Sequence, residues 1–356
     1  MGEKIKVLVV DDSALVRKII SDVLQRDPEI EVVGTANNGK SAVIKNETLN
    51  PDVITMDIEM PIMDGLEALR EIITTKPKPV IMMSVLTQYG AEATFKALEY
   101  GAVDFIPKPS TSLSLTVDDI AELLISKVKS VWRSKIAPHP GHPALARHDP
   151  STPRTELHLA PLPAPPGKSD KIVAIGTSTG GPSALLSIFQ RLPEKMPSAV
   201  LVVQHMPEGF TKAFAERLDN NSHLKVKEAE EGDRVLPGCG YIAPGHSHMR
   251  VESAGGAHIL RVFQSDKVNG HRPSIDVLFD SVADAFGRNS VGVIMTGMGR
   301  DGADGLLRIK TKGGFTLAQN EETSVVYGMN RVAVQIGAVA DIVPLVEIPG
   351  KIVEHL

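Results

Sequence analysis

A proline-rich segment divides this chain and limits what it can fold into. Nine prolines lie between Pro138 and Pro166, in a stretch with few clustered apolar residues. Such a segment cannot bury enough apolar surface to fold alone, and it favours extended, partly polyproline-like backbone. We therefore expect residues 133–167 to be a flexible linker between two domains, residues 1–132 and residues 168–356. A chain of 356 residues is long enough for both.

Composition narrows the class of protein. The net charge of −5 lacks the basic excess of nucleic-acid-binding domains, so we expect no nucleic-acid partner. No stretch reaches the length of a transmembrane helix, and the first apolar run is too short for a signal peptide. The single cysteine, Cys239, excludes an internal disulfide and fits a reducing compartment. These features predict a soluble, cytoplasmic protein without membrane insertion.

Apolar runs alternate with helical patterns in the first domain. The runs are rich in β-branched residues, are bounded by polar ones and do not alternate, as in strands buried on both faces of a parallel sheet. They cover residues 7–10, 53–56, 80–83 and 102–106. Helical spacing is found at residues 15–24, 65–75, 92–100 and 117–132. This order predicts a doubly wound α/β domain.

Charged and hydroxyl side chains stand where these expected strands end. Asp11 and Asp12 follow the first run, Asp57 the second, Ser84 the third and Lys108 the fourth. Ligands gather at the carboxyl ends of parallel strands, and carboxylate oxygens suit Mg²⁺. A lysine and a hydroxyl nearby would neutralise a transferred phosphoryl group. Any one of these residues could be a helix cap or a surface charge, but together they favour a site.

This set of residues resembles the response-regulator receiver family. The matching text covers residues 9–13, 57–65 and 105–109, together with Ser84. The resemblance implies a flavodoxin-like fold over roughly residues 4–132. It also implies Asp57 as the phosphoacceptor, Ser84 and Phe105 as switch residues, and Lys108 as the phosphate-binding lysine. Phe105 departs from the frequent tyrosine and carries no phenolic hydroxyl.

The same resemblance implies a Mg²⁺ cofactor for phosphorylation. Asp12 and Asp57 would be direct ligands, Asp11 would act through water, and Glu59 would offer its backbone carbonyl.

The second domain repeats the alternation of runs and helices. Its apolar runs are at residues 172–175, 199–203, 241–243, 259–263, 291–295 and 315–318, with helical patterns at 183–192 and 275–286. They predict a second, larger, mainly parallel sheet with helices on both faces. The expected fold class is therefore α/β, with two doubly wound, mainly parallel three-layer domains joined by the linker.

Three loops of the second domain could carry chemistry. Residues 176–180 read Gly-Thr-Ser-Thr-Gly, the pattern of a nucleophile elbow that exposes Ser178 between a strand and a helix. His205 follows one strand run as a candidate general base, and Asp301 follows another and could orient it. Taken singly, these loops could instead be a phosphate loop, a hydrogen-bonded histidine and an N-cap for a helix at 303–310. Taken together, they form a candidate Ser-His-Asp triad.

The order of these three residues along the chain disfavours one common topology. In the α/β-hydrolases the acid precedes the histidine. That topology would require His246, His248 or His271 as the base, after Asp233, Asp266 or Asp276. None of these histidines ends a strand run as strong as the one before His205.

The second domain resembles the chemotaxis protein-glutamate methylesterase (CheB) family. The matching segments are residues 175–182, 204–207, 241–249, 273–279 and 296–302, and a receiver in front is the usual architecture of that family. The resemblance implies Ser178 as nucleophile, His205 as general base and acid, and Asp301 as its orienting carboxylate. The backbone N–H groups of Thr179 and Met298 would form the oxyanion hole. His248 and Arg272 could line the substrate groove or be structural.

The two resemblances imply a regulated hydrolase. We expect a phosphorylation-activated methylesterase that demethylates glutamate methyl esters on methyl-accepting chemoreceptors and deamidates glutamines there, giving adaptation in two-component chemotaxis signalling. The phosphodonor would be a CheA-type histidine kinase, and the esterase chemistry would need no cofactor. One alternative is a response regulator with a DNA-binding output, which needs a helix-turn-helix and a basic face. Another is a non-catalytic module that holds a nucleotide at residues 176–181.

Overall fold

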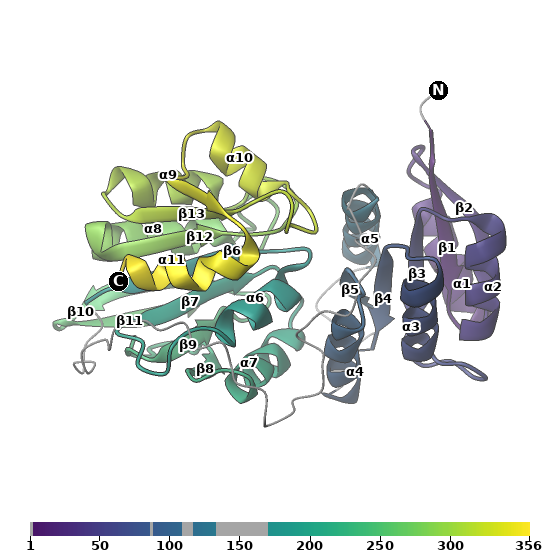
Figure 1. The fold of residues 1–356 in the computed structure, drawn as a ribbon, viewed down its shortest axis with the longest axis horizontal. Coiled ribbons are helices and arrows are strands. Elements are labelled where there is room, and N and C mark those ends of the chain that lie inside the picture. Colours follow the sequence, from purple (N-terminus) through teal and green to yellow (C-terminus); the bar gives the residue numbers. More distant parts are fainter. Residues whose placement is uncertain (1–2, 86–87, 109–116, 133–169) are drawn as a thin grey trace. The chain divides into compact units, whose positions relative to one another are not determined.

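The computed structural model describes residues 3–85, 88–108, 117–132 and 170–356 (Figure 1). The chain divides into two compact units, Met1–Arg154 and Thr155–Leu356. The expected linker at residues 133–167 lies outside the described residues. Within the described ranges, no helix is long and apolar enough to cross a membrane.

The first unit is a five-stranded parallel sheet with helices on both faces (Figure 1). Its strands are β1 (Ile5–Val10), β2 (Ile30–Ala36), β3 (Val53–Asp57), β4 (Val80–Ser84) and β5 (Asp104–Pro107), in the order β2-β1-β3-β4-β5. Its helices are α1 (Ala14–Leu24), α2 (Gly39–Leu49), α3 (Gly65–Thr75), α4 (Gln88–Glu99) and α5 (Val117–Val131). Helix α1 packs beside α5, while α2, α3 and α4 pack side by side. The strand order is that of the flavodoxin-like fold, which confirms the predicted class.

Local sequence explains where these elements begin. The Ser13 hydroxyl caps α1 by accepting from the Val16 N–H at 3.4 Å, and the Asp64 carboxylate caps α3 by accepting from the Glu67 N–H at 2.8 Å.

Strand β2 and helix α2 were not predicted. Most of the residues of β2 are only partly buried and Gly34 interrupts the strand, so its sequence contains no continuous apolar run.

The second unit is a seven-stranded parallel sheet in the order β14-β13-β12-β6-β7-β9-β8. The strands are β6 (Ile172–Thr177), β7 (Ala199–Gln204), β8 (Lys225–Glu228), β9 (Cys239–Ile242), β12 (Ser290–Ile294), β13 (Phe315–Gln319) and β14 (Asp341–Val343). Helices α8 (Ile275–Phe286), α9 (Ala303–Thr311) and α10 (Met329–Gln335) cover one face. Helices α6 (Gly181–Phe189), α7 (Phe210–Asn220) and α11 (Ile348–Glu354) cover the other (Figure 1). Short 3₁₀ turns, η1 (Gly287–Asn289) and η2 (Leu345–Glu347), complete the unit.

One predicted strand of this sheet lies elsewhere. The apolar run at residues 259–263 belongs to β11 (Ala257–Phe263), which pairs with β10 (His248–Ala254) in a separate antiparallel hairpin. Within β11 only Leu260 is fully buried. The run therefore does not reflect burial on both faces, because an antiparallel pair can leave one face to solvent.

The three central strands align their carboxyl ends. Thr177 at the end of β6 pairs with Gln204 of β7, and Gly176 pairs with Ile294 of β12. The connections run from β6 to β7 on one side and return to β12 on the other, so strand order reverses beside β6. Such a switch point is where open α/β sheets bind their ligands.

The first prediction concerns the packing that joins β6 to α8. A Cβ on Gly176 would lie 2.2 Å from Cγ2 of Ile275, a fully buried β-branched side chain. Because that methyl group cannot swing aside, Gly176→Ala should destabilise the second unit by about 1–3 kcal/mol. Hydrogen exchange of peptides from β6 and α8 at increasing urea concentration measures the change in the free energy of unfolding.

Gly350→Ala is the matched control, because Gly350 lies inside α11 and a Cβ there would meet nothing within 4 Å. That change should be neutral or stabilise the helix by roughly 0.5–1 kcal/mol. Equal stability of the two variants would contradict the packing argument.

Candidate functional sites

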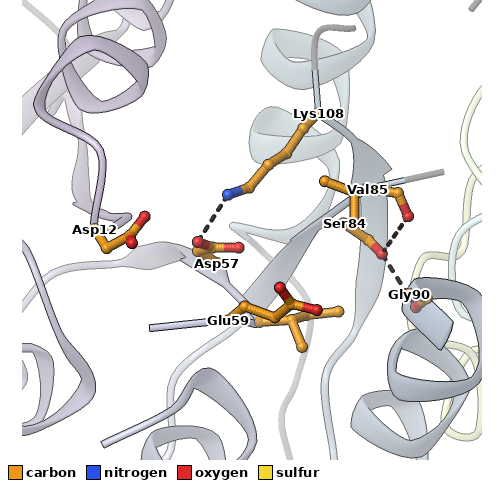
Figure 2. Close-up of a pocket in the computed structure, with 8 residues that line it drawn as sticks. Asp12, Asp57, Glu59, Ser84, Val85, Gly90 and Lys108 are labelled. Carbon is orange, nitrogen blue, oxygen red and sulfur yellow. Dashed lines mark hydrogen bonds and ion pairs between the residues drawn. The ribbon is translucent and has the colours of Figure 1, made fainter. Parts of the chain in front are cut away.

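An acidic pocket lies at the switch point of the first sheet (Figure 2). Carboxylate oxygens of Asp11, Asp12 and Asp57 all lie within 4.8 Å of one another. The Lys108 ammonium lies 2.8 Å from Asp11 Oδ2 and 2.7 Å from Asp57 Oδ2. The pocket holds about 200 Å³ and is lined by Asp12, Asp57, Ile58, Glu59, Ser84, Val85, Gly90 and Lys108. The structure thus brings together the residues predicted for this site.

Backbone contacts hold the acidic loops in place. The Arg17 guanidinium donates to the carbonyl oxygens of Asp11 and Asp12, at 2.8 and 2.9 Å. After β3 the chain folds so closely that a Cβ on Gly65 would lie 1.9 Å from the Asp57 carbonyl oxygen. The Gly65 N–H also donates to the Ile58 carbonyl at 2.8 Å. Only glycine allows this approach of α3 to the end of β3.

The pocket carries more negative than positive charge. Burial raises the pKa of Asp57 to about 6; the Asp11 carboxylate adds to the rise, while the Lys108 ammonium and the Glu59 N–H oppose it. Burial acts to lower the pKa of Lys108, but its two carboxylate partners more than offset this and raise it. Three carboxylates against one ammonium form a donor set that fits a hard divalent cation.

The predicted switch residues are both buried. The Ser84 hydroxyl donates to the Gly90 carbonyl at 3.1 Å and accepts from the Thr94 hydroxyl at 2.7 Å, so it is held toward α4 (Figure 2). Phe105 packs edge-on against Phe95, with ring centroids 6.3 Å apart. Thr94 was not predicted, because a threonine inside a helix gives no sequence signal for such a contact.

In the second unit, Ser178 directly follows β6. Its N–H donates to the Thr296 carbonyl at 3.0 Å, and its carbonyl accepts from the Gly181 N–H at 2.8 Å and from the Gln204 amide at 2.9 Å. The left-handed residue of this turn is Gly180, with a φ of 78°, and not the serine. The loop therefore carries Ser178 without placing strain on its own backbone.

His205 and Asp301 meet beside this loop. His205 Nε2 lies 2.9 Å from Asp301 Oδ2, and both side chains are buried. The His205 backbone N–H donates to the Thr177 carbonyl at 3.1 Å, which fixes the histidine next to the serine loop. Within residues 170–356, His205 Nδ1 and the Ser178 hydroxyl form no side-chain hydrogen bond. Catalytic contacts of this kind often tighten only when substrate binds.

Asp301 caps a helix, but not the one that the sequence suggested. Helix α9 is preceded by Gly302 and has no side-chain cap. Instead, the Asp301 carboxylate lies at the amino terminus of α8, where it accepts from the N–H groups of Ile275 at 2.6 Å and Asp276 at 3.4 Å. The Ser274 hydroxyl adds a third bond at 2.7 Å. The N-cap interpretation for residues 303–310 was therefore wrong.

The charge state of Asp301 follows from these contacts. Burial alone would raise its pKa, but hydrogen bonds from His205, Asn269 and the Ile275 N–H outweigh burial and lower it far below its ordinary value. Asp276 behaves oppositely: burial and the neighbouring Asp301 charge raise its pKa, against the opposing bond from the Gly305 N–H. Asp301 is thus held as a carboxylate that can accept a hydrogen bond from His205 Nε2–H.

Polar residues beneath the serine loop were missed by the sequence argument. The Gln204 amide also donates to the His205 carbonyl at 3.0 Å, so one side chain ties the two loops together. The Thr296 hydroxyl donates to the Thr179 carbonyl at 2.8 Å. A Cβ on Gly297 would lie 2.7 Å from that of Ser178, so the loop carrying Met298 lies against the serine. The position of Gln204 directly before His205 was the one sequence signal that could have indicated these hydrogen bonds.

His248 and Arg272, which the sequence analysis placed either in the substrate groove or in a structural role, both have structural contacts. His248 is fully buried, its Nδ1 accepts from the Ser274 N–H at 3.2 Å, and its Nε2 contacts the Asp266 carbonyl at 3.1 Å. Burial lowers its pKa, which keeps the ring neutral. The Arg272 guanidinium contacts the His246 ring at 3.2 Å and donates to the Ser265 carbonyl.

The two sites define a class of protein: a receiver-type acidic pocket on one α/β unit and a Ser-His-Asp arrangement on another, as in response regulators with a hydrolase output. Comparison with protein families agrees with this. Residues 173–352 match the CheB methylesterase family, and residues 7–117 match the response regulator receiver domain.

Relatives along the whole chain give the same result. The protein-glutamate methylesterase/protein-glutamine glutaminase of Pyrococcus horikoshii is 48% identical, with 99% of this chain and 94% of the relative covered. The Methanococcus maripaludis protein of the same name is 44% identical, covering 99% and 98%. The crystal structure of the Thermotoga maritima CheB methylesterase catalytic domain, 44% identical, matches 52% of this chain and 98% of that one with a TM-score of 0.52.

The chain therefore belongs to the CheB methylesterase family and is a hydrolase. The match of residues 173–352 to a methylesterase family counts against the alternative of a DNA-binding output.

The second prediction concerns the acidic pocket. Asp57→Asn removes one of the three carboxylates and should weaken Mg²⁺ binding about tenfold or more, because Mg²⁺ relies on few charged oxygens. Calorimetric titration with MgCl₂ measures the Mg²⁺ affinity of the variant and of the wild type. Asp64→Asn is the control, since Asp64 lies on the same loop and outside the cluster, and asparagine keeps the α3 cap. Equal affinities in the two variants would place the cation elsewhere.

Proposed function

We propose that this protein is a phosphorylation-activated protein-glutamate methylesterase and protein-glutamine glutaminase that acts on methyl-accepting chemoreceptors through Ser178, His205 and Asp301. The observation that supports it most is the buried contact between His205 Nε2 and Asp301 Oδ2 beside the Ser178 loop, in a chain of this family. It also argues against a nucleotide-holding module, which would have no use for an ionised acid behind a histidine.

In the first half of the reaction the serine is acylated. Asp301 accepts a hydrogen bond from the Nε2–H of His205, which keeps the proton of the neutral ring on Nε2 and leaves Nδ1 free to act as the base. Nδ1 takes the proton of the Ser178 hydroxyl while Oγ attacks the γ-carbonyl carbon of the methylated glutamate. The backbone N–H groups of Thr179 and Met298 are the candidate donors to the resulting oxyanion. As the tetrahedral intermediate collapses, His205 returns the proton to the methoxy oxygen and methanol leaves.

In the second half water hydrolyses the glutamyl ester. His205 takes a proton from the water, whose oxygen attacks the ester carbonyl, and returns it to Ser178 Oγ as that bond breaks. Glutamate and the free serine result. With a glutamine side chain the same steps release ammonia in place of methanol. No step requires a cofactor in this unit.

The receiver unit supplies the regulation. Asp57 is the proposed phosphoacceptor, and Asp11, Asp12, Asp57 and the Glu59 carbonyl would hold the Mg²⁺ ion. When bound, the cation offsets charge on the phosphoryl oxygens. Lys108 lies close enough to Asp57 to pair with the same group, and Ser84 would exchange its Gly90 contact for a phosphoryl oxygen. A receiver domain implies a phosphodonor kinase, and we propose one of the CheA type.

The third prediction tests the nucleophile. Ser178→Ala should leave the fold intact and lower methanol release from methylated receptor fragments by a factor on the order of 10³ to 10⁶, as for other hydrolases that lose this group. Ser183→Ala is the control, because Ser183 is exposed on the first turn of α6. Retention of half the wild-type rate by the Ser178 variant would refute the triad assignment.

The fourth prediction tests regulation. A small-molecule phosphodonor with Mg²⁺ should raise methanol release by the full chain about tenfold, a shift that needs only about 1.4 kcal/mol between resting and active populations. Asp57→Asn should neither incorporate acid-labile phosphate nor respond. Incorporation at unchanged stoichiometry in that variant would move the acceptor to another residue, and incorporation without a rate change in the wild type would end the activation proposal.

A further inference from the structure

A tight turn between β11 and α8 reaches into the hydrolase site. Asn269 and Gly270 have φ values of 52° and 81°, and Val268 and His271 exchange backbone hydrogen bonds of 3.1 and 2.9 Å. Positive φ at both central residues is the mark of a type I′ turn, for which Asn-Gly is the favoured pair. The turn therefore presents the side chain of Asn269 from a rigid backbone.

The Asn269 carboxamide lies between two buried acids. Its Nδ2 donates to Asp301 Oδ1 at 3.0 Å and to Asp276 Oδ2 at 2.6 Å, so each amide hydrogen serves one carboxylate. Asp276 and Asp301 are 7% and 1% exposed. Two carboxylates this close and this buried repel each other, and a shared donor offsets the repulsion.

The same turn contacts the base. His271 stacks on His205, with ring centroids 3.8 Å apart and planes 11° from parallel. Other charged or titratable groups near the pair are Asp276 and Asp304, whose charges act on this cluster, and His248 and Arg272, which are held by Asp266 and His246. Asn269 is the neutral donor among them that touches both acids.

We propose that Asn269 is a positioning residue of the hydrolase: its carboxamide holds Asp301 in the orientation that accepts the hydrogen bond from His205 Nε2–H, and it keeps the charge of Asp276 from displacing Asp301. The inference rests on the proposed roles of His205 and Asp301. It concerns the chemistry of the site and not the binding of the methylated substrate.

Asn269→Gly is the sharpest variant, because glycine keeps both positive φ angles and removes only the amide. In the full chain we expect kcat for methanol release to fall about tenfold or more, as for a lost hydrogen bond to a charged group, with KM changed less than twofold. Asn50→Gly is the matched control: Asn50 is also an exposed asparagine with positive φ (47°), but it lies at the end of α2 in the other unit.

A second readout does not need the receptor substrate. The rate at which a fluorophosphonate labels Ser178 should rise with pH as His205 becomes neutral. Removing the donor beside the His205–Asp301 pair favours the imidazolium, so the midpoint of this rise should move to higher pH in Asn269→Gly. It should move further in Asn269→Asp, which tolerates the same backbone and adds a negative charge. A role limited to forming the turn would leave the midpoint in place.

The outcomes separate the two proposals. An unchanged kcat, an unchanged midpoint, or a rise in KM at constant kcat would each overturn the positioning role. If the wild-type chain is labelled at Ser178 but releases no methanol, the receptor substrate is wrong, and the midpoint shift still tests Asn269.

Discussion

The proposed hydrolase site depends on one buried carboxylate, that of Asp301, at the amino terminus of a helix. Asp301 lies in the loop between β12 and α9 and accepts hydrogen bonds from the first N–H groups of α8, which are otherwise unpaired at a helix start. The partial positive charge of that terminus favours the ionised acid. The same carboxylate contacts His205 at the end of β7. The Asp301 carboxylate therefore connects the sheet edge, the start of α8 and His205, and the geometry of each depends on the other two.

The two units solve a similar electrostatic problem in different ways. In the receiver, Asp57 is buried beside another carboxylate, and one ammonium only partly offsets this, so its pKa is raised to about 6. In the hydrolase, Asp301 is also buried beside a carboxylate, but several N–H and O–H donors surround it and its pKa is lowered. The carboxylates around Asp57 can therefore still be stabilised by an added cation. The charge of Asp301 is already stabilised by hydrogen-bond donors of the protein itself.

Much of this could be predicted from the sequence, and the omissions have physical causes. Buried parallel strands leave continuous apolar runs in the sequence. The fold class and the residues that follow β1, β3, β6 and β7 could therefore be predicted. The edge strand β2 and the hairpin strand β11 were missed or misplaced, because partial burial produces no such run. The capping of α8 by Asp301 and the contacts of Asn269 join residues far apart in sequence, which local patterns cannot show. The Asn-Gly pair was nevertheless a visible turn signal.

The double use of Asp301 has a practical consequence for experiments in cells. An inactive reference protein should lose chemistry while keeping its abundance. Replacing Asp301 by alanine would also strip α8 of its cap and leave Ser274 and two backbone donors without their acceptor. Such a protein would be exposed to proteolysis, and a missing phenotype could not be told from missing protein. Within the part of the chain that the structure describes, the Ser178 hydroxyl makes no such structural contact. With Ser178 as the proposed nucleophile, Ser178→Ala is therefore the better inactive control for complementation experiments.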